Sequence, residues 1–161
     1  MFLKLTQNLS LGVPPEQSWK FLRDTERLTA LIPGVESVKK ATETDSQDER
    51  YIVHVVEKVG PFRLRLNIDV RVVEAVEPSL LRAELSGADS AGGNRISGTL
   101  SAELKGSGPS STLLLFDVSL EILGKLAALG AVPIRRRATE LFGQFAGRVQ
   151  EQFAETAQGQ S

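Results

Sequence analysis

Few side chains in this sequence have the chemistry of a catalytic or metal site. The 161 residues contain one histidine, His54, and no cysteine, which excludes thiol catalysis, disulfide bonds and thiolate metal ligands. His54 falls on the outward face of its expected strand, and no HExxH motif or carboxylate–histidine cluster accompanies it. A catalytic triad needs a general base, and nothing supplies one. We therefore predict no catalytic residue, no metal and no cofactor.

Glu57 is the ionisable side chain that the sequence places on an apolar strand face. It lies an even number of residues from Tyr51, Val53, Val55 and Val59, so its side chain is expected on the same face of the strand. A carboxylate in apolar surroundings is costly unless it is paired. Two interpretations follow. Glu57 either has a raised pKa and holds a ligand's polar head or acts as an acid, or it lies near the sheet rim, wetted or paired with an arginine or lysine.

Three consecutive cations, Arg135, Arg136 and Arg137, follow Pro133. They could contact anionic lipid head groups or an acidic partner surface, or they could form a solvated helix face. They lie mid-helix if the helix begins near Gly124 and near its N-terminus if it begins close to Pro133. The formal net charge of −1 gives no overall attraction to nucleic acid, so no nucleic-acid partner is expected.

Alternating apolar and polar residues predict an antiparallel sheet with one dry and one wet face. The clearest case is 62–72, where six apolar residues alternate with charged or polar ones. Residues 41–49 are polar and predict a turn. The expected strands are 2–13, 36–40, 51–59, 62–72, 80–88, 96–104 and 112–122.

Helical signals flank these strands. Two prolines and Glu16 predict a helix start that carries Trp19 inward, and a second short helix ends at Pro33-Gly34. From Gly124 onward the apolar spacing is helical. The expected fold class is α+β: a curved seven-stranded antiparallel sheet around one long C-terminal helix, with two short helices after the first strand. We expect one domain, 1–155, and a disordered tail, 156–161.

Several segments, in this order and spacing, resemble the carbon monoxide dehydrogenase G-subunit family, within the START-type helix-grip (SRPBCC) superfamily. The most specific short motifs are IPGVES, VGPF and GKLAALG. The resemblance implies a sheet that grips the C-terminal helix, with an apolar cavity between them. The matching segments are SWKFLRDTERLTALIPGVESV (18–38), KVGPFRLRLNIDVRV (58–72), SGADSAGGNRISG (86–98) and TLLLFDVSLEILGKLAALG (112–130).

The expected cavity wall combines inward-facing residues of the sheet and the helix. Each of these residues is as consistent with an ordinary hydrophobic core as with a cavity wall, and Trp19 is most simply a core anchor. The interpretation of the whole set as a cavity wall therefore rests on the resemblance. The set is Trp19, Tyr51, Val53, Val55, Glu57, Phe62, Leu64, Leu66, Phe116, Val118, Ile134, Leu141 and Phe145.

The resemblance implies a non-enzymatic carrier of a hydrophobic small molecule, a quinone or lipid. It also implies an accessory role for a molybdenum-containing carbon monoxide dehydrogenase-like oxidoreductase. No secretory signal or membrane-spanning run is visible, so we expect a cytoplasmic protein with a peripheral contact at the inner face of the membrane. Two alternatives stay open: a cyclase- or dehydratase-type enzyme on the same fold, and an interaction module without ligand.

Overall fold

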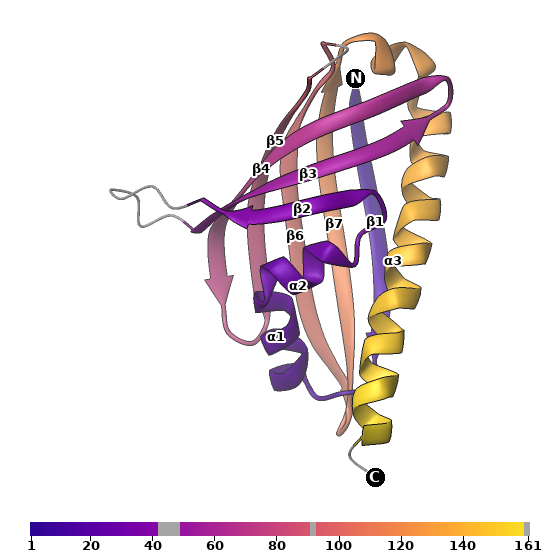
Figure 1. The fold of residues 1–161 in the computed structure, drawn as a ribbon. Helices are drawn as coiled ribbons and strands as arrows, with labels where there is room; N and C mark the ends of the chain where they lie inside the picture. The colour runs from indigo at the N-terminus through magenta and orange to yellow at the C-terminus, as the bar shows by residue number, and fades with distance from the viewer. Residues whose placement is uncertain (42–48, 91–92, 160–161) are drawn as a thin grey trace.

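A computed structural model describes the backbone of residues 1–41, 49–90 and 93–159 and the side chains up to residue 153. The described residues form one antiparallel seven-stranded sheet in the order β1-β7-β6-β5-β4-β3-β2, which wraps around a long helix (Figure 1). The elements are β1 (Phe2–Leu11), α1 (Pro15–Arg23), α2 (Thr25–Ala30), β2 (Val35–Lys40), β3 (Glu49–Val59), β4 (Phe62–Val76), β5 (Leu80–Asp89), β6 (Arg95–Gly108), β7 (Ser111–Leu123), the 3₁₀ helix η1 (Lys125–Leu129) and α3 (Ala131–Gly159).

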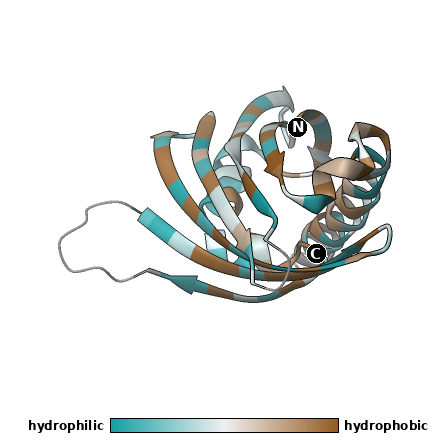
Figure 2. Cartoon of the chain, turned by 90° about the horizontal axis from the view of Figure 1, so that it is seen from above, coloured by the Kyte–Doolittle hydropathy of each residue, from teal (hydrophilic) through white to brown (hydrophobic). Residues whose placement is uncertain are grey.

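The α+β helix-grip architecture expected from the sequence is confirmed. Bands of apolar and polar residues alternate along the strands in Figure 2, as a sheet with one covered face requires. Strand β4 continues to Val76, past the expected end at Val72, and a register shift between Val72 and Glu74 marks where it bends. The turn expected at 41–49 falls mostly on residues 42–48, which lie outside the described part of the chain.

Strands β6 and β7 approach each other closely at Gly98. A Cβ added to Gly98 would stand 1.9 Å from the carbonyl oxygen of Ser119, so the two backbones approach too closely there for any side chain. Glycine therefore permits this close approach of the two strands.

The short helices follow the local signals. Pro14 and Pro15 occupy the cap and first position of α1, and the Asp24 carboxylate accepts a hydrogen bond from the Arg27 backbone N–H at the start of α2. After Pro33, Gly34 adopts a φ of +86°, and a Cβ there would lie 2.6 Å from the Val56 carbonyl oxygen. Gly34 thus permits both the reversal and the close approach of the chain to β3.

The C-terminal helix begins later than the apolar spacing predicts. Helix α3 starts at Ala131, not near Gly124, because Gly124 and Gly130 have positive φ angles of 105° and 80° that interrupt a helical backbone. The five residues between them form η1. The helix continues to Gly159, within the expected tail of 156–161; residues 160–161 lie outside the described part, so the boundary at 155 stays a prediction.

Helix α3 lies along β1, the edge strand of the sheet (Figure 1). Arg135 donates a hydrogen bond to the Lys4 carbonyl oxygen at 3.4 Å, and Gln150 donates one to the Ser10 carbonyl oxygen at 3.5 Å. These side chains satisfy carbonyl groups that an edge strand leaves without a ladder partner. Arg148 donates to the Leu31 carbonyl oxygen at 3.2 Å, which ties α3 to the end of α2.

The described side chains form two separate hydrophobic clusters, one toward each end of α3. The upper cluster surrounds Leu126 and Ile134, near the start of α3, and the lower cluster surrounds Phe145 and Val149. Upper cluster members are Leu3, Val59, Leu64, Leu66, Ile122, Leu126 and Ile134. Lower cluster members are Leu9, Leu11, Val13, Trp19, Phe21, Leu22, Leu81, Ala102, Leu104, Leu114, Phe116, Phe145 and Val149.

Candidate ligand-binding site

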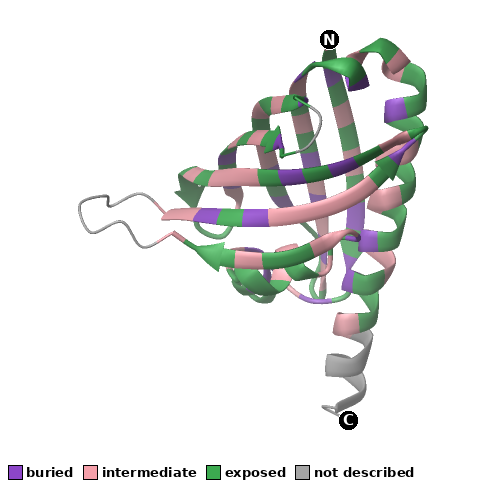
Figure 3. Ribbon diagram, turned by 45° about the horizontal axis from the view of Figure 1, so that its top comes forward, coloured by how far each residue is buried: buried purple, intermediate pink, exposed green. Residues whose placement is uncertain are grey.

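Apolar side chains on the concave face between the two clusters are only half-buried. Four apolar side chains there, which we call the central zone, are Val70 of β4, Leu85 of β5, Val118 of β7 and Leu141 of α3. All four are half-buried, and among the described side chains they belong to neither cluster. Figure 3 shows buried, half-buried and exposed segments following one another along the strands. Part of each of these four apolar side chains therefore remains accessible to water.

Strand pairing shows that the central zone lies on one face. Val70 pairs with Leu85, and Leu85 pairs with Gly98. Residues paired directly across an antiparallel sheet have side chains on the same face. The small Gly98 leaves the middle of this row without a side chain.

The predicted cavity residues divide among the two clusters and the space between them. Trp19, Phe116 and Phe145 belong to the lower cluster, where Trp19 is buried at 6 % exposure and acts as a core anchor. Val118 and Leu141 lie in the central zone. The upper cluster contains Leu64, Leu66 and Ile134 with Val55 and Phe62 packed against it, while Tyr51 and Val53 are buried on β3. A role of this set in ligand binding stays a prediction.

Glu57 faces inward and is paired at the rim. It accepts a hydrogen bond from Arg137, its side chain is 13 % exposed, and it also accepts one from the Lys58 N–H at 3.2 Å. Glu140 forms a second ion pair with Arg137 at 3.0 Å. The hydrogen bonds to Glu57 and Glu140 raise the pKa of Arg137, so the guanidinium stays charged. The paired interpretation of Glu57 is thus the one that the structure shows.

The three arginines point in different directions. They occupy the second turn of α3, because the helix begins at Ala131. Arg137 turns toward β3 and is half-buried, whereas Arg135 and Arg136 are exposed. A contact of these arginines with a membrane or a partner stays a prediction, and the two exposed residues are the ones positioned for it.

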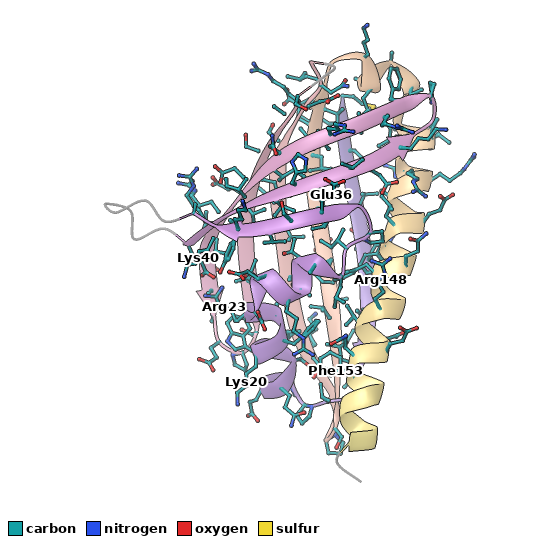
Figure 4. The ribbon with its side chains drawn as sticks, in the orientation of Figure 1. Lys20, Arg23, Glu36, Lys40, Arg148 and Phe153 are labelled. Carbon is teal, nitrogen blue, oxygen red and sulfur yellow. The ribbon has the colours of Figure 1, made fainter. Side chains whose placement is uncertain are left out.

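A second inward polar group was not predicted. Arg23, the last residue of α1, donates a hydrogen bond to Glu49 at 2.6 Å, and the Tyr51 hydroxyl donates one to the other carboxylate oxygen of Glu49 at 2.6 Å. Figure 4 shows Arg23 on the same side of the molecule as Lys40, at the end of β2. We call Arg23, Glu49 and Tyr51 the polar cluster.

The polar cluster holds a charged carboxylate next to a protonated phenol. Burial alone would raise the pKa of Glu49, but the hydrogen bond from Tyr51 and the pairing with Arg23 outweigh it and hold that pKa below its ordinary value. Burial and the hydrogen bond to Glu49 raise the pKa of Tyr51. Tyr51 therefore keeps its proton at neutral pH.

The alternation of side chains along β3 could have revealed part of the polar cluster. Glu49 is two residues before Tyr51 and shares its face, but the sequence assigns Glu49 to the polar turn, and only the pairing of Glu49 with Val72 extends β3 that far. Nothing in the local sequence places Arg23 beside it, since the two residues are 26 positions apart.

The opposite face of the sheet carries an open depression of about 500 Å³ that contains none of the predicted cavity residues. Its charged side chains are paired with each other, Arg50 with Asp69 and Arg71 with Glu84. The lining residues are Arg50, Asp69, Arg71, Glu84, Leu85, Ser86, Ser97, Gly98 and Thr99.

His54 lies on the outer face, as expected. It contacts the Asn67 side-chain oxygen at 2.5 Å and lies 3.7 Å from Glu36. Across residues 1–41, 49–90 and 93–153, whose side chains are described, no group of three or more histidine, aspartate or glutamate side chains is arranged to hold a metal ion. Over the same ranges, no helix has the length and apolar character needed to cross a bilayer.

Comparison with known proteins gives one family and one fold. A family model described as CoxG, the G-subunit of carbon monoxide dehydrogenase, matches residues 8–154. No curated protein matches the chain. A conserved protein from Geobacillus kaustophilus shares the fold with a TM-score of 0.81 and 21 % identity, over 96 % of this chain and 97 % of that one.

Two further structures extend the fold comparison. A START superfamily protein from Mycobacterium smegmatis has a TM-score of 0.71 and 14 % identity, covering 95 % of this chain and 98 % of that one. The Zhui aromatase/cyclase from Streptomyces sp. R1128 has a TM-score of 0.65 and 13 % identity, covering 98 % and 96 %. Identities this low show a shared fold and do not transfer an activity.

Proposed function

Because the chain belongs to the CoxG family of carbon monoxide dehydrogenase G-subunits, we propose that it is a non-enzymatic carrier of a hydrophobic small molecule, a quinone or lipid. The carrier would serve a molybdenum-containing oxidoreductase of the carbon monoxide dehydrogenase type. The family and the START-like fold support binding of a hydrophobic ligand; the ligand's identity and the partner enzyme are the proposed part.

The central zone is the observation that carries this proposal. Val70, Leu85, Val118 and Leu141 face inward and yet remain half-buried between two well-packed clusters. Every 100 Å² of apolar surface that a ligand removes from water there contributes about 2.5 kcal/mol. Binding by burial alone is therefore favourable without a charged anchor.

Pairing of the inward ionisable groups favours a carrier over an enzyme. Glu57 is held by Arg137, and Glu49 is held by Arg23 and Tyr51. A general acid or base works best with a pKa near neutrality, whereas the pKa of Glu49 is lowered and that of Tyr51 is raised. The pairing and these pKa directions support uptake and release of a ligand without chemical change.

Probe binding with a blocking variant tests the carrier function. Delipidated protein would be titrated with a fluorescent apolar probe, and native mass spectrometry of the purified protein would identify any co-purified molecule. Val118→Phe should weaken probe binding at least about tenfold by filling the central zone. Val73→Phe adds the same bulk at a side chain that is 46 % exposed and serves as the matched control. Absence of uptake by the unaltered protein, or equal binding by both variants, would contradict the proposal.

A peripheral membrane contact at the start of α3 forms part of the same proposal. Exposed Arg135 and Arg136 lie at the end of the molecule that also carries three exposed apolar side chains, Phe2 at 79 %, Leu123 at 50 % and Val132 at 65 %. Cations flanking exposed apolar groups suit an anionic bilayer surface. In vesicle co-sedimentation, the double variant R135E/R136E should lose binding to anionic vesicles, while R82E on the outer face should not.

A further inference from the structure

The Arg23 guanidinium has hydrogen-bonding capacity that the protein leaves unused. Its Nη2 donates to Glu49 at 2.6 Å, but its Nη1 is buried and has no hydrogen-bond partner among the described residues. Buried charged donors are normally satisfied by a protein group, an ordered water or a ligand. Nη1 is therefore a candidate donor to an oxygen from outside the chain.

The other members of the polar cluster do not supply that acceptor. Glu49 accepts one hydrogen bond from Arg23 Nη2 and one from Tyr51, and neither of its oxygens is bonded to Nη1. Tyr51 gives its single proton to Glu49 and also interacts with Thr25. The unmet need at this point is for an acceptor, so a ligand group there must bring an oxygen with a free lone pair.

The charges around the cluster favour a negative oxygen. Lys40 pairs with Tyr51 across β2 and β3 and acts electrostatically on Glu49. Among the described residues that act on Glu49, Arg23 and Lys40 carry two positive charges against its single negative charge. A hydrogen bond from a charged guanidinium to an anionic oxygen is also stronger than one to a neutral oxygen.

The polar cluster adjoins the central zone across the sheet. Tyr51 pairs with Val70, which pairs with Leu85, and Glu49 pairs with Val72 in the neighbouring row. Val118 lies in that same row, four strands from β3, or at most about 19 Å at the usual strand spacing. An elongated apolar molecule could therefore cover the central zone and place one end at Arg23.

We propose that Arg23, positioned by Glu49 and Tyr51, binds an oxygen at one end of the apolar ligand and prefers an anionic oxygen such as a carboxylate. The inference deepens the proposed carrier function and rests on it. The proposal gives the ligand a polar end and a defined orientation. The polar end lies beneath α1, and the apolar body lies along β4 to β7.

A matched pair of probes tests this assignment. The long-chain fluorescent cis-parinaric acid and its methyl ester share the same chain. The end group is an anionic carboxylate in the acid and a neutral methyl ester in the other. The unaltered protein should bind the acid about tenfold more tightly than the ester at pH 7. Arg23→Met should bring this ratio close to one while changing the ester affinity by less than about twofold.

Two further variants keep the result interpretable. R23M leaves Glu49 without its cation, so the double variant R23M/E49Q removes both charges and should show the same loss of preference in a protein of restored stability. R82M, an arginine on the outer face, is the control and should keep the unaltered ratio.

The outcomes separate the two proposals. Equal binding of acid and ester by the unaltered protein, or a preference that survives in both R23M and R23M/E49Q, overturns the role of Arg23 and leaves the carrier function standing. Failure of the unaltered protein to take up either probe overturns the carrier function and the anchor with it. An Arg23 that only fastens α1 to β3 would change stability without changing the acid-to-ester ratio.

Discussion

Arg137 on α3 and Glu57 on β3, 80 residues apart in the sequence, form an ion pair that joins the gripped helix to the sheet. On its other side, the same helix is held to edge strand β1 by the hydrogen bond from Arg135 to Lys4. The second turn of α3 is thus fastened to both sides of the curved sheet. The half-buried central zone begins one turn further along, at Leu141.

Replacing Glu57 by glutamine should lower the free energy of unfolding by about 1–2 kcal/mol, because Arg137 loses a charged, mostly buried partner. Probe binding should stay within about twofold, since the pair lies at the rim. Urea denaturation and probe titration measure the two effects. Glu140→Gln, at an exposed partner of Arg137, is the control and should cost less than about 0.5 kcal/mol. Lost binding with unchanged stability in E57Q would instead place Glu57 in the ligand site.

Protonation of Glu49 should make the protein less stable at acidic pH. Its pKa is lowered in the folded state, so its contribution is fully present above the unfolded value of about 4.3 and disappears as the pH falls through the folded value. The stability difference between the unaltered protein and E49Q should therefore shrink from pH 7 to pH 3. Glu103→Gln, on the exposed face of β6, controls for loss of a carboxylate. A difference that is independent of pH would contradict the pairing.

Two glycine-to-alanine substitutions should have opposite effects on the free energy of unfolding. Gly98→Ala places a methyl group 1.9 Å from the Ser119 carbonyl oxygen and should destabilise the fold by at least about 2 kcal/mol. Gly143→Ala, on α3, meets no atom within 4 Å and should stabilise it by about 1 kcal/mol through helix propensity. Thermal or urea unfolding gives both values. A neutral G98A would mean that β6 can shift away from β7.

Asn94 should control the mobility of η1. This buried side chain accepts a hydrogen bond from the Leu126 N–H at 2.9 Å and donates one to Asp89 at 3.1 Å. Asn94→Ala should cost about 1–3 kcal/mol and speed amide hydrogen exchange in residues 124–130. Ser90→Ala, at an exposed residue of the same loop, provides the comparison. Unchanged exchange at Leu126 would show that the hydrogen bond from Leu126 to Asn94 does not restrain η1.

Local patterns in the sequence were sufficient for most of the fold. The alternation in 62–72 predicted a strand with one covered face, because neighbouring side chains on a strand necessarily point to opposite sides. Pro33 and Gly34 predicted the end of α2, because their backbone preferences act within one or two residues. The family resemblance then supplied the expectation of a space between sheet and helix.

Only the tertiary structure decided which polar groups meet. The sequence showed that Glu57 faces inward, but its partner Arg137 depends on how α3 is rotated and where it begins, and two glycines moved that beginning to Ala131. The polar cluster likewise needs α1 to bring Arg23 onto the end of β3. Periodicity is a short-range property of the backbone, whereas these contacts are set by packing between segments far apart in the chain. For that reason the sequence by itself determined the covered face of each strand, and the folded chain determined what that face encloses.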